Sequence, residues 1–237
     1  MKKNLIFGAT GSIGSALVKK LHDNGDDCHL VGRQPDLLKE MSEKFNYNYS
    51  VCDVLNINQV EELSKELSET EVSGIAYCIG SIDLKPFQQT EAKDFISSFA
   101  LNLVSATDIL KMFEKSLKRN KGSVVFFSTI AARKGFNNHS IISASKSALE
   151  GLSVALAAEF APNIRVNCIA PSLTDSKISN FLIKNEKTKE MISKLHPLKR
   201  IGQGSDSASL AKFLLSDESS WITGQIIGVD GGRSSIV

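Results

Sequence analysis

The sequence predicts an α/β protein whose single parallel sheet is covered by helices on both faces, a doubly wound architecture of three layers. Segments expected to be strands and helices alternate along the chain, which is typical of parallel sheets. The 237 residues are enough for one hydrophobic core, and no stretch rich in Pro, Gly and Ser divides them. A glycine-rich turn joins the first strand to the first helix. We therefore expect residues 1–237 to form one domain.

The first strand and helix lie in residues 4–21, NLIFGATGSIGSALVKKL. Residues 5–7 are an apolar run, glycines follow at Gly8, Gly11 and Gly14, and Leu17 and Leu21 continue at helical spacing. Such a turn lets the backbone approach a phosphate, which the free N–H groups and the helix dipole stabilise. The pattern predicts a dinucleotide ligand, although glycines at this spacing also suit a tight turn without one.

The second strand, residues 29–32, ends on Arg33, about twenty residues beyond the glycine turn, where dinucleotide folds select their cofactor. An acidic residue there would bind the ribose of NAD and repel a 2′-phosphate, whereas an arginine favours NADP. The alternative is an exposed arginine at a strand end.

The remaining elements follow in order. Helices are predicted at residues 37–45, 56–68, 90–119 and 139–160, and strands at a segment ending on Cys52 and at residues 74–79, 123–127, 164–169 and 224–229. The third strand leads to Asp53, which either caps the next helix or contacts an adenine amine. The long helical region is expected to bury Phe95, Phe99, Leu103 and Ile109. Asn102 inside it is an unfavourable helix residue, so it is either solvated or functional.

Composition excludes several kinds of partner. The formal net charge is +2 with basic residues spread along the chain, so we expect no nucleic-acid partner. The four cysteines form no CxxC pair and only four histidines are present, so we expect no metal site and buried, reduced thiols. The apolar run after the N-terminal lysines ends at Gly8, and no segment approaches 18 apolar residues. We expect a cytoplasmic protein with no membrane association.

Seven motifs together resemble the short-chain dehydrogenase/reductase family over essentially the whole chain. They are GATGSIG at 8–14, CDV at 52–54, Asn102, FFST at 126–129, SASK at 143–146, VNCIAPSLTDS at 166–176 and ITGQIIGVDGG at 222–232. The resemblance implies a Rossmann-type sheet of about seven parallel strands, an NAD or NADP cofactor and hydride transfer to a small-molecule substrate. It also implies a homo-oligomer, commonly a tetramer, with a dimer as the alternative.

The resemblance also implies roles for individual residues. Asp53 and Val54 would hold the adenine, Gly80 would lie beside the ribose, and residues 171–174 would line the nicotinamide. The complete implied cofactor site is Gly8, Thr10, Gly11, Ile13, Gly14, Arg33, Asp53, Val54, Gly80, Lys146, Pro171, Ser172, Leu173 and Thr174. Residues 174–197 match the substrate lid of the family. The lysines of the lid either favour an anionic substrate or form a solvated face.

The chain departs from the family pattern at four places. The loop glycines occupy its first, fourth and seventh positions, and the Asn-Asn-Ala-Gly segment of the family is replaced by residues 77–80, YCIG. Thr129 stands in place of the catalytic serine. Four residues before Lys146, where the family has its tyrosine, stands Ile142. Isoleucine cannot deliver the proton that carbonyl reduction requires.

His139, seven residues before Lys146, is a candidate replacement for the missing acid. Divergent enoyl reductases of the family place their tyrosine at that spacing, and histidine titrates near neutral pH. On this hypothesis His139 supplies the proton, Thr129 orients the substrate oxygen and Lys146 holds the nicotinamide ribose. The competing interpretation is a loop histidine without a catalytic part.

The sequence thus predicts an NADP(H)-preferring oxidoreductase, with NAD(H) as a possible cofactor, that reduces a carbonyl or a conjugated enoyl or enone substrate. Its expected catalytic residues are Asn102, Thr129, Lys146 and His139. The alternative is a non-catalytic NAD(P)-binding sensor or a silent subunit of a hetero-oligomer, which Ile142 favours. A sugar-nucleotide enzyme is a third possibility, opposed by the short lid and by the lack of a C-terminal substrate domain.

Overall fold

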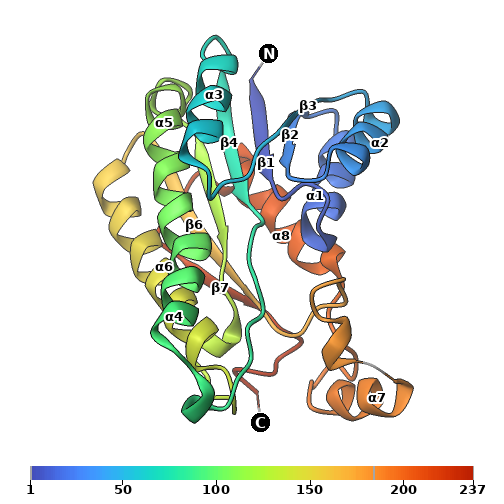
Figure 1. Ribbon diagram of the computed structural model, residues 1–237. Helices are drawn as coiled ribbons and strands as arrows, with labels where there is room; N and C mark the ends of the chain where they lie inside the picture. The colour runs from blue at the N-terminus through green and yellow to red at the C-terminus, as the bar shows by residue number, and fades with distance from the viewer. Residues whose placement is uncertain (1, 184, 237) are drawn as a thin grey trace.

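The computed structural model describes residues 2–183 and 185–236, and it contains one seven-stranded parallel sheet in the order β3-β2-β1-β4-β5-β6-β7. Helices cover both faces of the sheet (Figure 1). The strands are β1 (Lys3–Phe7), β2 (Asp27–Gly32), β3 (Asn48–Val51), β4 (Val72–Tyr77), β5 (Ser123–Phe127), β6 (Arg165–Pro171) and β7 (Ile226–Val229). The predicted doubly wound α/β class is confirmed.

Eight α-helices are present in the described residues: α1 (Ser12–Asp23), α2 (Pro35–Phe45), α3 (Ile57–Glu66), α4 (Ala92–Phe99), α5 (Ser105–Asn120), α6 (Ser140–Phe160), α7 (Glu186–Lys194) and α8 (Gly204–Leu215). Helices α3 to α6 lie on one face of the sheet and α1, α2 and α8 on the other (Figure 1). Helix α7 stands apart from the sheet, in the segment predicted to be a lid.

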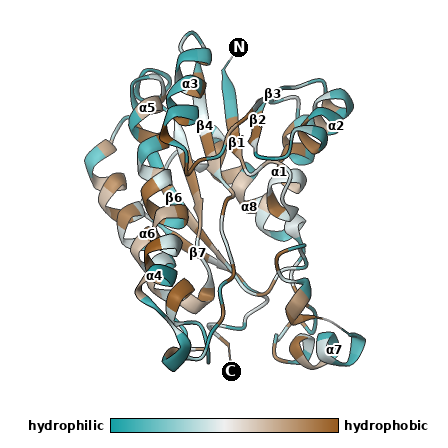
Figure 2. Ribbon diagram, viewed as in Figure 1, coloured by the Kyte–Doolittle hydropathy of each residue, from teal (hydrophilic) through white to brown (hydrophobic). Residues whose placement is uncertain are grey.

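Alternation of side chains along the strands builds a separate core on each face. In β1, Leu5 and Phe7 enter the core shared with α3, α5 and α6, while Ile6 enters the core shared with α1, α2 and α8. A strand covered on both faces must be apolar throughout, and β5 is buried at all five residues. Figure 2 shows the hydrophobic colour of the central strands and the hydrophilic colour of much of α7.

The helical region predicted at residues 90–119 is interrupted by a π-helical turn, Ala100–Val104, between α4 and α5. Of the four residues expected to be buried, Ile109 is buried, but Phe95, Phe99 and Leu103 are only half-buried, so the prediction is wrong for these three. A π turn adds a residue to the helical repeat and rotates the face that follows it. The buried positions of residues 90–119 are instead Ser98, Asn102, Ser105, Ala106, Ile109, Leu110, Phe113 and Leu117.

Two helices, α7 and α8, lie where no helix was predicted. Helix α8 begins with Ser-rich sequence of weak helix propensity, and it is stabilised by packing against α1 and the sheet. Helices α1 and α8 approach so closely that a Cβ atom on Gly204 of α8 would lie 2.2 Å from the carbonyl oxygen of Ser12 in α1. Helix α8 is therefore stabilised by tertiary packing, which a local sequence pattern does not reveal.

Two helical stretches of the described residues, Ala92–Asn120 and Ser140–Phe160, have the length and mean hydropathy of a membrane span, although neither is an uninterrupted apolar segment. In the fold both carry core residues of the sheet, among them Ile109 and Leu149. Their apolar faces therefore have a structural explanation within the domain.

Candidate active site

The carboxyl ends of the strands open into a cavity of about 1160 Å³ that collects nearly all predicted site residues. Of the predicted cofactor residues, Gly14 alone is not in its wall, and of the predicted catalytic residues, Asn102 alone is not. Ligands of open parallel sheets bind at the carboxyl edge, between the two strands from which the chain continues outward in opposite directions. In this sheet these strands are β1, followed by β2 and β3 on one side, and β4, followed by β5 to β7 on the other. A cavity of this size accommodates a dinucleotide together with a small substrate.

The glycine turn between β1 and α1 has the geometry of a phosphate cradle. Gly8 has φ +76°, a left-handed conformation that favours glycine. A Cβ atom on Gly14 would lie 2.2 Å from the carbonyl oxygen of Gly8, so only glycine lets α1 approach the turn. Gly11 caps α1 without a side-chain hydrogen bond, which leaves the first amides of the helix available to an anion from the cavity. These residues fit a dinucleotide pyrophosphate.

Arg33 and Asp53 lie together at one end of the cavity, where an Arg33 Nη1 to Asp53 Oδ2 distance of 3.9 Å makes a loose, solvent-exposed ion pair. Asp53 does not cap α3. Asn56 caps that helix, and Asp53 Oδ1 accepts instead from the Leu55 N–H at 3.1 Å. The capping alternative for Asp53 is therefore wrong, and its carboxylate holds a turn at the wall of the cavity.

Lys146 is buried at the centre of the site. Its Nζ donates a 2.7 Å hydrogen bond to the carbonyl oxygen of Phe127, the last residue of β5. Burial lowers the pKa of Lys146 to about 8, because the ammonium loses its hydration and no carboxylate replaces it. The ammonium form therefore predominates at neutral pH but loses its proton in mildly alkaline solution.

Asn102 and Gly80 meet beside Lys146. Asn102 Nδ2 donates to the Ser98 carbonyl at 2.9 Å, while its buried Oδ1 has no partner among the described residues. A Cβ atom on Gly80 would lie 3.2 Å from both Asn102 Oδ1 and Lys146 Nζ. Asn102 sits in the π-helical turn, which explains an asparagine inside a helical region, and its unpartnered oxygen is ready to accept a hydrogen bond from a water molecule or a ligand.

Thr129 follows β5 and faces the cavity. Its Oγ1 accepts a 3.2 Å hydrogen bond from the Ala131 N–H, which leaves the hydroxyl hydrogen free to be donated to a substrate oxygen. The next helix brings Ile142 into the same wall, where the side chain is 4% exposed. Thr129 and Ile142, which stand at the family's serine and tyrosine positions, thus line one cavity.

His139 also lines this cavity, at the N-terminal end of α6. Its Nδ1 lies 2.6 Å from the carbonyl oxygen of Asn137. A carbonyl can only accept, so Nδ1 carries the proton of the neutral ring and Nε2 gains a proton only when the ring becomes cationic. The structure therefore brings His139 to the predicted site.

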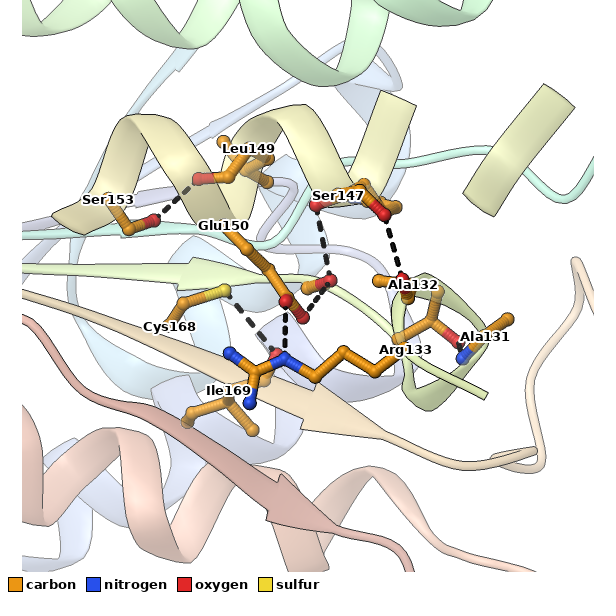
Figure 3. A network of polar contacts seen from close by, with 12 residues as sticks. Ala131, Ala132, Arg133, Ser147, Leu149, Glu150, Ser153, Cys168 and Ile169 are labelled. Carbon is orange, nitrogen blue, oxygen red and sulfur yellow. Dashed lines mark hydrogen bonds and ion pairs between the residues drawn. The ribbon is translucent and has the colours of Figure 1, made fainter. Parts of the chain in front are cut away.

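A buried carboxylate that the sequence pattern did not reveal braces the loop around Thr129. Glu150 Oε1 accepts from Ser128 Oγ at 2.9 Å, and Glu150 Oε2 accepts from Arg133 Nε at 2.7 Å (Figure 3). Ser147 Oγ donates to the Ala132 carbonyl, a second link from α6 to the loop. The spacing of Ser128, Arg133 and Glu150 carries no recognisable motif, so only the fold reveals this network.

The predicted lid is tied down where it starts and ends. Thr174 forms an isolated parallel bridge with Gly202, and Ser12 Oγ in the glycine turn donates to the Asp175 carbonyl at 2.8 Å. Residue 184 of the lid lies outside the described residues, as do residues 1 and 237 of the predicted domain. Arg233, one residue beyond the last motif, and Phe136 also line the cavity and were not predicted.

No group of three or more His, Cys, Asp or Glu side chains with metal-binding geometry occurs in residues 2–183 and 185–236. Cys28, Cys52 and Cys168 are buried free thiols as predicted, whereas Cys78 is half-buried and lines the cavity.

Comparison with known proteins agrees with this geometry. The family model described as Enoyl-(Acyl carrier protein) reductase matches residues 8–234. A tropinone reductase homolog of Arabidopsis thaliana is 34% identical over 238 residues, covering 96% of this chain and 91% of its own, and a second is 32% identical over 240 residues, covering 97% and 89%. A short-chain type dehydrogenase/reductase structure from Mycobacterium ulcerans superposes with a TM-score of 0.91 at 27% identity, covering 98% of this chain and 90% of its own. With its cradle, its buried lysine and these relatives, the chain belongs to the short-chain dehydrogenase/reductase family of oxidoreductases.

Proposed function

We propose that this protein is an NADP(H)-preferring reductase that transfers a hydride to a carbonyl or to a conjugated enoyl or enone double bond. The observation that carries the proposal is the meeting of Lys146, Thr129 and a glycine cradle in one cavity. Bound NADPH would supply the hydride. The protein residues would bind the cofactor, orient the substrate oxygen and deliver a proton to it.

The preference for NADP rests on the end of β2. Gly32, Arg33 and Gln34 line the cavity, and none of them is acidic. Arg33 is mostly exposed and held only loosely by Asp53, so its guanidinium is free to turn toward a 2′-phosphate. Structures of relatives whose descriptions name NADP, such as one from Beutenbergia cavernae at 25% identity, agree with this choice.

Reduction of a carbonyl also requires a proton donor. Ile142 cannot donate a proton, and we assign this role to His139. The imidazolium would donate its Nε2 proton to the substrate oxygen as the carbonyl carbon receives the hydride. The neutral ring left behind carries its proton on Nδ1, which is the form that the Asn137 carbonyl already binds. Thr129 would donate its free hydroxyl hydrogen to the same oxygen, and Lys146 would hold the nicotinamide ribose.

A second candidate function rests on Ile142 itself. A buried isoleucine in the wall of the reaction site suits a protein that binds NADPH without turnover, as a redox sensor or a silent subunit. Two features of the site argue against it: Lys146 is buried, and within the described residues Asn102 Oδ1 has no hydrogen-bond partner. Both arrangements cost stability, which a function at this site would justify.

Homo-oligomer formation is part of the proposal. Ile96, Val104 and Val154 expose 68%, 49% and 47% of their surface on α4, the π-helical turn and α6, which are neighbouring elements on one side of the sheet. A second copy of the chain would cover this apolar face. Sedimentation equilibrium of the purified protein measures whether it is a monomer, a dimer or a tetramer.

The first experiment is NADPH consumption against a panel of ketones, aldehydes and enones, with NADPH binding followed by its fluorescence in the same samples. We expect turnover that His139→Phe slows by about 10²-fold, the usual contribution of a general acid. His22→Gln, a change at an exposed histidine of α1, is the matched control. NADPH binding without turnover on every substrate would favour the sensor, and an unaffected His139→Phe enzyme would remove His139 from the mechanism.

A further inference from the structure

The cavity wall combines apolar side chains with positive charge. Among its apolar side chains are those of Ile82, Phe136, Ile142, Leu182 and Ile192. The acidic residues of the described wall are Asp53, which pairs with Arg33, and Asp175. The cations Lys177 and Arg233 also line the cavity, and within the described residues neither forms an ion pair with Asp53 or Asp175.

Arg233 is held in place from two sides. Its guanidinium carbon lies 4.9 Å from the centre of the Phe136 ring, and Nη1 lies 3.5 Å from Ser172 Oγ. The Arg233 carbonyl accepts a 2.6 Å hydrogen bond from Lys134 Nζ, which fixes the backbone. The side chain is thus stacked on an aromatic face with the N–H edge of its guanidinium left for a ligand.

A short relay orients the serine that contacts Arg233. His196 is 1% exposed, and its Nδ1 lies 2.9 Å from the Ile192 carbonyl, so the neutral ring carries its proton there. Nε2 must then accept the hydroxyl hydrogen of Ser172, at 2.8 Å. The lone pairs of the Ser172 oxygen therefore face Arg233, and this oxygen orients the guanidinium as its hydrogen-bond acceptor.

Arg233 belongs to none of the ion pairs formed within residues 2–183 and 185–236. The charge of Asp230 acts on it from a distance, but the Asp230 oxygens accept from the N–H groups of Gly232 and Ser234. Burial has the larger effect and lowers the pKa of the Arg233 guanidinium in spite of Asp230. A half-buried cation without a paired carboxylate is costly, and an anionic ligand would remove that cost.

We propose that Arg233 binds a carboxylate group of the substrate, so that the preferred substrates are oxo acids or oxo-enoic acids rather than neutral ketones. This inference rests on the proposed reductase function. Phe136 covers one face of the guanidinium, and the remaining N–H edge matches the two oxygens of a carboxylate. Phe136 also contacts His139, with 5.4 Å between ring centres, so the anion site and the proton donor flank one ring.

The test compares acids with their esters. Wild type, Arg233→Met and Arg233→Lys are assayed for NADPH consumption with 5-oxohexanoate and trans-4-oxo-2-pentenoate and with the methyl ester of each. We expect wild type to prefer the acids in kcat/KM by about 10- to 100-fold, the discrimination of a charged hydrogen-bonded pair. Arg233→Met should lose the preference, and Arg233→Lys should retain part of it. Arg119→Met, at an exposed position near the end of α5, is the control.

Binding separates this inference from the reductase proposal. Calorimetric titration of 5-oxohexanoate into the wild-type and Arg233→Met proteins, each with NADPH, measures the anion site without any turnover. Binding to wild type that Arg233→Met weakens supports the site even if no NADPH is consumed. Equal rates for acid and ester, an unchanged preference in Arg233→Met, or no binding at millimolar concentration would overturn it. Arg233-dependent reduction of dihydroxyacetone phosphate with no use of the oxo acids would make the anion a phosphate and overturn the carboxylate assignment.

Discussion

Lys146 shows at the scale of one residue how function opposes stability in this site. The ammonium is buried with one carbonyl as its acceptor, and its pKa falls from 10.5 to about 8. A shift of this size corresponds to about 3 kcal/mol of unfavourable free energy in the folded protein at neutral pH. A replacement of Lys146 would also remove the hydrogen bond of the Phe127 carbonyl, which costs about 1 kcal/mol and offsets part of the gain.

Lys146→Met should therefore stabilise the protein without cofactor by about 1–2 kcal/mol at pH 7, while NADPH consumption falls by about 100-fold or more. Urea unfolding at pH 7 and activity assays measure the two effects. Because the unfolded chain binds more protons between pH 8 and 10.5, wild-type stability should rise with pH across that range, and Lys146→Met should lack the rise. Lys39→Met, at an exposed position of α2, is the control. A Lys146→Met protein less stable than wild type at pH 7 would contradict this account.

Single residues also show where sequence reasoning stops. The end of a predicted strand placed Thr129 at the edge of the sheet, and the resemblance to the family motif around Lys146 selected Lys146 and His139. The structure brings all three into one cavity. Glu150 and Arg233 could not be found that way. Their partners are separated from them along the chain, as Arg133 is from Glu150 and Phe136 is from Arg233, and no local pattern joins such pairs.

At the scale of elements, the strands were predicted well and the helices unevenly. The predicted positions of all seven strands agree with the structure to within a few residues. The central strands were located by apolar runs, since parallel strands covered on both faces must be apolar throughout. Helix α8 was missed because its Ser-rich start has weak propensity and its stability comes from α1. The π-helical turn Ala100–Val104 was missed because it changes the helical period that the prediction relied on.

Helix α1 provides an element-scale prediction, because its position depends on a glycine. Gly14→Ala would place a methyl group 2.2 Å from the Gly8 carbonyl oxygen, and backbone cannot yield as a flexible side chain would. We expect a loss of about 2–3 kcal/mol in the free energy of unfolding and weakened NADPH binding, since α1 must move away from the cradle. Urea unfolding and fluorescence titration with NADPH measure both.

Gly151 in α6 is the matched comparison for Gly14. It is exposed within a long helix, and a Cβ atom there would meet nothing within 4 Å. Gly151→Ala should therefore stabilise the protein by about 0.5–1 kcal/mol through helix propensity alone. Equal effects of the two substitutions would show that crowding at the cradle does not determine the fate of Gly14→Ala.

At the scale of the whole molecule, two buried histidines connect folding stability to pH: His29 in strand β2 and His196 after helix α7. His29 Nε2 lies 2.7 Å from Ser50 Oγ, and Ser50 donates its hydroxyl hydrogen to Glu66, so His29 must be the donor to Ser50. His196 is bound between the Ile192 carbonyl and Ser172. Burial lowers the pKa of both rings below the ordinary value of 6.5, because the cationic ring would lose its hydration, and this outweighs the opposing effects of Glu66 on His29 and of the Ile192 carbonyl on His196.

We expect the free energy of unfolding to fall as the pH decreases below 6.5. In that range the histidines of the unfolded chain bind protons while His29 and His196 of the folded protein still resist them, so acid favours unfolding. The slope can reach about 1.4 kcal/mol per pH unit for each histidine. Urea unfolding at half-unit steps from pH 7.5 to 5 measures it, and the double variant His29→Gln with His196→Gln should have a shallower slope. His22→Gln removes an exposed histidine and should leave the slope as it is in wild type. A double variant as steep as wild type would place the acid sensitivity in other groups, such as carboxylates whose protonation begins at lower pH.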